Sequence, residues 1–144
     1  MASIDVQQQP VAVGRRRYAV LFGAAVVAAG LNYLVARGAV ALGANAGFAP
    51  LTAPVFVPLT LLGTAAGYAG WTLVRRRSAA ALKVVVPLVL VLSMIPDLLL
   101  LATKFIPDAS GTAVAGLMLM HLVVTAVAVP AYQFTSQVSG PKTS

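Results

Sequence analysis

The residues of this sequence most able to do chemistry are one aspartate and one histidine inside apolar segments. Asp97 follows Pro96 in the run LVLSMIPDLLLLA, and His121 is the one histidine of the chain. Because histidine titrates near neutrality and intramembrane ionisable residues often mark a path, this pair could pass a proton. It could instead join two helices and satisfy carbonyl groups that the proline leaves free. We favour the structural interpretation, because no second acidic residue lies in an apolar run.

Other polar residues lie at similar depths in the remaining apolar runs. At about 1.5 Å per helical residue, Asn32, Thr60 and Asp97 fall at one level of the membrane. Ser93 and His121 fall within about one helical turn below that level. Packed helices bring such inward-facing groups together. We therefore expect one intramembrane polar cluster formed by Asn32, Thr60, Ser93, Asp97 and His121. Arg37 and Lys104 are expected to cap this cluster from the outer surface.

The residue inventory excludes several kinds of site. The chain has no cysteine and a single histidine. Thiolate nucleophiles, disulfides, iron–sulfur ligation and bis-histidine haem are therefore excluded, and zinc would need further ligands at fixed spacing. We expect no metal, no cofactor and no catalytic residue, and hence a protein that is not an enzyme.

Long apolar runs make up most of the chain. Of its 144 residues, 60% are hydrophobic and 9% are charged, with a mean hydropathy of +0.93. About 20 apolar residues in a helix cross a hydrocarbon core of about 30 Å. The sequence therefore predicts an all-α, polytopic four-helix bundle in a membrane over residues 18–134. The expected spans are about 18–36, 55–74, 84–102 and 112–131, between cytoplasmic tails at 1–17 and 135–144.

Basic residues indicate the orientation of these spans. If both termini are cytoplasmic, the outer segments hold only Arg37 and Lys104. The inner segments then hold Arg15, Arg16, Arg17, Arg75, Arg76, Arg77, Lys83 and Lys142. Aromatic rings that favour the membrane interface lie at the same ends, at Tyr18, Tyr68, Trp71 and Tyr132. The positive-inside rule and the aromatic girdle thus both predict an N-in/C-in, multi-pass protein of the plasma membrane.

The arginines also indicate a partner. The first arginine triplet (Arg15, Arg16, Arg17) and the second (Arg75, Arg76, Arg77) flank apolar runs, where basic residues are attracted to anionic lipids. Although the net charge is +7, the basic residues do not alternate with aromatics on a polar face, so we expect no nucleic-acid partner. The small residues Gly63 and Gly67 predict close helix packing, and less directly a homo-oligomer.

An arginine-led export signal is an alternative interpretation of the N-terminus. The stretch RRRYAVLFGAAVVAAG, followed by GANAG, resembles such a signal with cleavage after Ala46. However, its apolar core is longer than the 7–15 residues typical of signals, and Arg37 separates it from the cleavage site. We therefore expect this segment to remain as the first span.

The stretches IPDLLLLA and LMLMHLVVTAVAVPAY resemble a family of uncharacterised small four-span membrane proteins of high-GC Gram-positive bacteria. An acidic residue in the third helix and an M-H-L-V-type stretch in the fourth recur in that family, and they match Asp97 and residues 120–123 here. The resemblance implies an architecture but no activity.

The sequence as a whole favours a non-catalytic accessory or assembly component that binds a larger membrane complex or a second copy of itself. The alternative is a small transporter or proton-linked carrier that uses Asp97 and His121.

Overall fold

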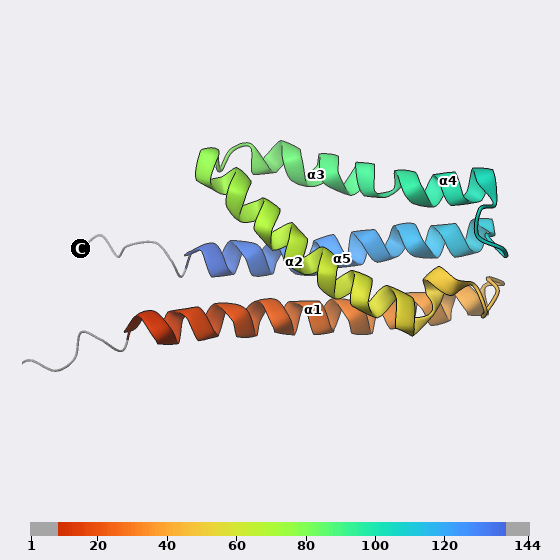
Figure 1. The fold of residues 1–144 in the computed structure, drawn as a ribbon, viewed down its shortest axis with the longest axis horizontal. Helices are drawn as coiled ribbons and strands as arrows, with labels where there is room; N and C mark the ends of the chain where they lie inside the picture. The colour runs from red at the N-terminus through yellow and green to blue at the C-terminus, as the bar shows by residue number, and fades with distance from the viewer. Residues whose placement is uncertain (1–8, 138–144) are drawn as a thin grey trace, which may run out of the picture.

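The computed structural model describes residues 9–137, and every regular element among them is a helix (Figure 1). Four segments, Gly14–Ala41, Ala53–Arg77, Leu82–Thr103 and Gly111–Gln137, are long and apolar enough to cross a membrane. The prediction of an all-α chain with four such segments is therefore confirmed. The elements are α1 (Gln9–Ala41), η1 (Ala49–Leu51), α2 (Ala53–Arg77), α3 (Leu82–Ser93), α4 (Ile95–Thr103) and α5 (Gly111–Gln137).

Helix α1 extends beyond the predicted span at both ends. It begins at Gln9 instead of Tyr18, so residues 9–17 of the expected tail are helical, because arginine and alanine are good helix formers. It ends at Ala41 and is followed by Gly43, whose φ is +101°. Ala44 N–H donates to the Ala39 carbonyl, and Gly43 N–H donates to the Val40 carbonyl. This pair of bonds is a Schellman motif, in which a left-handed glycine satisfies the last carbonyls of a helix.

The C-terminal helix also runs past its predicted end. Helix α5 continues to Gln137, so the start of the predicted tail at 135–144 is helical. Residues 1–8 and 138–144, which hold the rest of both predicted tails and Lys142, lie outside the described residues.

The third apolar segment is divided into two helices. Helix α3 ends at Ser93 and α4 begins at Ile95, with Pro96 in the first turn of α4. A proline lacks the backbone N–H and clashes with the preceding turn, so a continuous helix is disfavoured there. The break creates a helix N-terminus in the middle of an apolar segment, and Asp97 lies in its first turn.

Helices α1 and α5 lie side by side and antiparallel, and α2 crosses them diagonally (Figure 1). The buried face of α1 carries Ala25, Ala28, Ala36 and Ala39. Small side chains let helix backbones approach closely, and a Cβ added to Gly116 of α5 would lie 3.0 Å from the Cβ of Ala39. Tight packing of small residues therefore holds this pair of helices together.

An aromatic cluster joins α2 to the end of α5. The ring of Tyr132 lies 5.6 Å from that of Tyr68 and 5.8 Å from that of Trp71, between centroids. Trp71 and Tyr132 are buried, whereas Tyr18 is exposed. Two of the rings expected in the interfacial girdle thus pack within the protein.

The segment formed by α3 and α4 packs more loosely than the other three. Leu82 and Asp97 are its only buried residues. Leu82 belongs to the cluster around Trp71 and Tyr132, and Asp97 lies near the middle of the segment. The segment is therefore fully buried only at these two points, and Val86 and Leu100 pack against the two core clusters as partly buried residues.

The close approach at Gly116 gives a direct test of the α1–α5 packing. A Gly116→Val substitution should lower the free energy of unfolding by about 1–3 kcal/mol, because the added methyl groups meet Ala39, whose Cβ cannot move without its backbone. Thermal unfolding in mild detergent measures the effect. Gly30→Val is the matched control, since a Cβ at Gly30 meets nothing within 4 Å, and equal midpoints for the two variants would contradict this packing.

Candidate functional site

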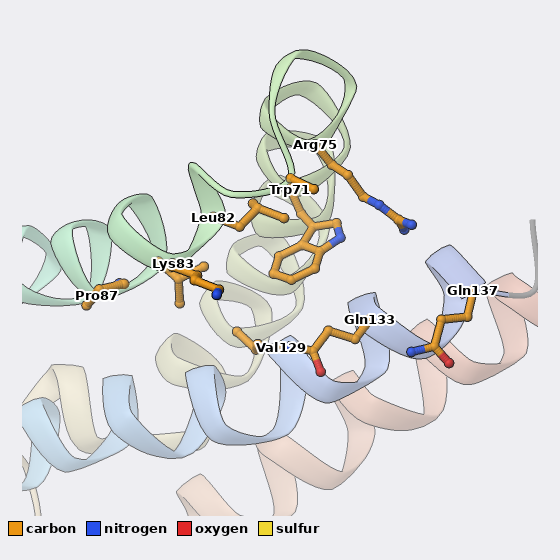
Figure 2. A pocket seen from close by; sticks show the side chains of 10 residues that line it. Trp71, Arg75, Leu82, Lys83, Pro87, Val129, Gln133 and Gln137 are labelled. Carbon is orange, nitrogen blue, oxygen red and sulfur yellow. The ribbon is translucent and has the colours of Figure 1, made fainter. Parts of the chain in front are cut away.

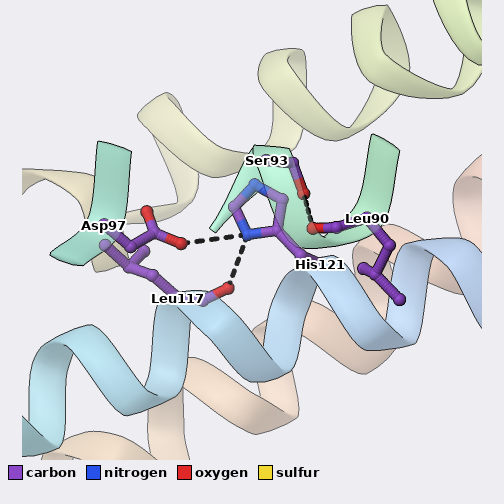
Figure 3. Close-up of polar contacts among 5 residues, drawn as sticks. All are labelled: Leu90, Ser93, Asp97, Leu117 and His121. Carbon is purple, nitrogen blue, oxygen red and sulfur yellow. Dashed lines mark hydrogen bonds and ion pairs between the residues drawn. The ribbon is translucent and has the colours of Figure 1, made fainter. Parts of the chain in front are cut away.

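Asp97 and His121 form an ion-pair contact between α4 and α5 (Figure 3). Oδ2 of Asp97 lies 3.2 Å from Nδ1 of His121, and the same nitrogen lies 2.9 Å from the carbonyl oxygen of Leu117. Because that carbonyl only accepts, Nδ1 carries a hydrogen and donates it there. Oδ2 is buried and receives no hydrogen bond from the described residues. The contact between the two side chains is therefore electrostatic, without a well-aligned hydrogen bond.

The break in the third segment also places Asp97 in the first turn of a helix. The first N–H groups of a helix have no partners within the helix, and its dipole favours negative charge at that end. Asp97 lies in the first turn of α4 and is 6% exposed. The imidazole of His121 thus faces the carboxyl group of a buried residue that lies close to the positive end of the α4 dipole.

A second polar pair joins α1 to α2. Asn32 Nδ2 donates to Thr60 Oγ1 over 3.0 Å, and both residues are buried. Thr64 Oγ1 donates to the Thr60 carbonyl over 2.8 Å. Oδ1 of Asn32 is buried and has no hydrogen-bond donor among the described residues.

Ser93 does not hydrogen-bond to either pair. Its hydroxyl donates to the carbonyl of Leu90 over 2.7 Å, at the end of α3 (Figure 3). The expected polar cluster thus consists of two separate pairs and a serine that bonds to its own helix.

A cavity connects these polar residues. It has a volume of about 880 Å³ and lies between α2, the α3–α4 segment and α5. Most of its lining is apolar, and the polar groups exposed to it include all members of the predicted cluster, namely Asn32, Thr60, Ser93, Asp97 and His121. Volumes of about 300–1,000 Å³ with few polar groups are typical of small-molecule sites.

Neither residue expected to cap the cluster forms an ion pair with Asp97. Arg37 is exposed, and Lys104 Nζ donates to the carbonyl of Ala109 in the turn between α4 and α5. Asp97–His121 is the one ion pair among residues 9–137. Lys104 therefore stabilises its own turn and does not neutralise Asp97.

The two arginine triplets lie at one end of the molecule, near the start of α1 and the turn between α2 and α3 (Figure 1). The guanidinium of Arg16 lies 5.5 Å from the ring centroid of Phe134, a cation–π contact between α1 and α5. The second triplet forms the last turn of α2, where cations complement the helix dipole. All three of its members are exposed.

Two further links between α2 and α5 were not expected from the sequence. Trp71 Nε1 donates to Ser136 Oγ over 3.1 Å, and the Tyr132 hydroxyl donates to the carbonyl of Thr64 over 2.6 Å. Buried tryptophan and tyrosine usually find a polar partner. The residue types therefore indicated that Trp71 and Tyr132 would each bond to a polar group. Their partners could not be predicted, because they are far away in the sequence.

A second cavity, of about 440 Å³, lies beside these links (Figure 2). It is found where α2, the start of α3 and the end of α5 meet. Its polar lining consists of Arg75, Lys83, Gln133 and Gln137. Within the described part of the chain, no group of three or more His, Cys, Asp or Glu side chains could hold a metal ion.

These features define a small, all-helical protein whose four apolar helices suit a membrane. The chain belongs to a family of unknown function, DUF6069, whose profile matches residues 9–137. No curated protein and no solved structure matches the chain. The match supports the expected uncharacterised family, while the high-GC Gram-positive lineage stays a prediction.

A double-mutant cycle tests the link between α4 and α5. Asp97→Ala and His121→Ala should each lower the unfolding free energy, and the double variant should lose less than the sum, with a coupling of about 0.6–1.7 kcal/mol. Thermal or denaturant unfolding in detergent measures all four proteins. Thr125→Ala, which alters the same cavity, is the control and should be additive with Asp97→Ala. Additive losses for Asp97→Ala and His121→Ala would show that the contact contributes nothing.

Proposed function

We propose that the chain is an integral protein of the plasma membrane that crosses the bilayer four times, with both termini in the cytoplasm. Four helices of sufficient length and hydropathy support this proposal. Both arginine triplets lie at one end of the molecule (Figure 1), and the opposite end carries Arg37 and Lys104. The asymmetry of the basic residues favours a cytoplasmic location for the arginine-rich end.

The protein acts in this proposal without catalysing a reaction, as an accessory or assembly component of the membrane. The observation that carries the proposal is the use of the intramembrane polar groups. Asn32 and Thr60 join α1 to α2, and Asp97 and His121 join α4 to α5. Polar side chains that link helices in this way stabilise an assembly within lipid, and they do not need a substrate for that role.

Association with a larger complex or with a second copy is part of the same proposal. Gly23 and Gly30 lie on the exposed face of α1, seven residues apart, and a Cβ at either would meet nothing within 4 Å. Small residues on a face that the chain itself does not use permit another helix to approach closely.

A small transporter or proton-linked carrier is the second candidate, and the larger cavity favours it. Asp97 and His121 both line this cavity, and Oδ2 of Asp97 has no hydrogen-bond donor among the described residues. A carboxylate and an imidazole on one cavity wall have the chemistry to exchange a proton with a bound solute.

The proposed orientation predicts which side of the membrane each turn faces. The chain has no cysteine, so Ser78→Cys and Asn45→Cys each introduce a single thiol, in the α2–α3 turn and in the α1–α2 turn. In intact cells a membrane-impermeant maleimide should label the Asn45 variant but label the Ser78 variant only after lysis. The reverse pattern would contradict the N-in/C-in orientation.

A flux assay separates the accessory role from the carrier. If the protein is an accessory component, proteoliposomes of wild type and Asp97→Asn should dissipate an imposed pH gradient no faster than empty vesicles, while Asp97→Asn lowers thermal stability. Thr125→Ala serves as the control for general damage to the cavity. Wild-type flux that survives in Thr125→Ala and is lost in a folded Asp97→Asn variant would favour the carrier instead.

A further inference from the structure

The two cavities adjoin one another, and we refer to the pair as the groove. Trp71, Leu82, Val86 and Val129 line both of them, so the larger apolar cavity meets the smaller one at the arginine-rich end of the molecule. The groove therefore has an apolar interior and a polar mouth. These two parts match the apolar and polar parts of an amphipathic molecule.

The mouth of the groove is positively charged. Arg75 extends from the end of α2 above α5, Lys83 lies on the first turn of α3, and Gln133 and Gln137 lie on α5 (Figure 2). Neither cation has a carboxylate partner among the described residues, whose one ion pair is Asp97–His121. Arginine and lysine with neighbouring amide donors fit an anionic group rich in oxygen atoms, such as a phosphate.

The interior of the groove has space along one face of α2. Gly63 and Gly70 line the larger cavity, and a Cβ at either position would meet no atom within 4 Å. The facing helix α3 contributes Val85 and Val89. Glycines opposite branched aliphatic side chains leave an apolar channel between helices that pack loosely, and a hydrocarbon chain fits such a channel.

We propose that this groove binds one anionic phospholipid, with its headgroup in the smaller cavity lined by Arg75 and Lys83 and an acyl chain between α2 and α3. The site differs from general attraction of arginines to a lipid surface, because Arg76 and Arg77 of the same triplet do not line it. The location of the headgroup at the cytoplasmic surface depends on the orientation proposed above, whereas the contacts of the lipid do not.

Trp71 offers a direct readout of this site. It is the only tryptophan of the chain, is 8% exposed, and lines both cavities. Bromine atoms on an acyl chain quench tryptophan fluorescence on contact. The full-length protein is reconstituted in phosphatidylcholine vesicles that contain a small fraction of brominated phosphatidylglycerol or, in parallel, brominated phosphatidylcholine.

Brominated phosphatidylglycerol should quench Trp71 at a lower mole fraction than brominated phosphatidylcholine. The preference should be about 25-fold, given a factor of about five for each of two basic residues near an anionic lipid. Arg75→Gln with Lys83→Gln should remove it. Arg76→Gln with Arg77→Gln, which removes the same charge outside the groove, should retain it, and inorganic phosphate should not compete.

Side chains that fill the channel should reduce the binding of both lipids. Gly63→Leu and Gly70→Leu place a side chain in the groove and should reduce quenching by either brominated lipid, whereas Gly23→Leu on α1 should not. Equal quenching by both lipids in the wild type would overturn the proposal. It would also be overturned if Arg76→Gln with Arg77→Gln reduced the lipid preference as much as Arg75→Gln with Lys83→Gln does. Competition by inorganic phosphate would also overturn it, by indicating a site for free anions.

The outcome is separable from the proposed function. Exterior labelling at Ser78→Cys would contradict the orientation without changing the quenching preference. Absence of the preference would leave the orientation and the accessory role unaffected.

Discussion

The structure depends on one constraint, namely that polar groups within an apolar environment must find partners in the protein itself. Pro96 cannot donate a backbone hydrogen bond, so the third segment ends one helix at Ser93 and begins another at Ile95. The new helix N-terminus favours acidic side chains, and Asp97 lies in its first turn. Its carboxylate is in turn paired with His121 on α5. One of the two buried residues that attach this segment to the rest of the protein thus lies directly after the backbone break.

Polar links and small-residue packing share the work of holding the helices together. In lipid there is no hydrophobic force between helices, so close van der Waals contact and interhelical hydrogen bonds must replace it. The α1–α5 pair relies on close contact, as at Gly116 and Ala39. Helix α2 relies on directed bonds, from Asn32 at one end and to Ser136 at the other. The α3–α4 segment has the fewest buried residues, and the large cavity lies on its inner side.

The sequence was sufficient to predict four apolar helices, because length and hydropathy depend only on composition along the chain. It predicted helix ends less well, since the arginines before Tyr18 and the residues after Arg37 are compatible with a helix, and the stop before Gly43 depends on a backbone conformation. Depth along a helix follows from the fixed rise per residue, so the polar residues were expected at similar depths in one cluster. Their pairing depends on helix rotation and crossing, and the diagonal course of α2 is a tertiary property that no local pattern contains. For the same reason the partners of Trp71 and Tyr132 could not be foreseen.

The buried face of α1 has a consequence for how uniquely the protein is assembled. Its alanines recur at 25, 28, 36 and 39, with Asn32 as the single large polar residue between them. The alanine pattern repeats after eleven residues, since positions 25 and 28 recur as 36 and 39, so the alanines alone do not distinguish two registers of α1 that differ by that shift. Such a shift would carry the Asn32 amide away from Thr60 and leave it without a partner in hydrocarbon, where that costs free energy. Asn32 therefore specifies a single register of α1 against its neighbours, as a lone buried asparagine does in a coiled coil.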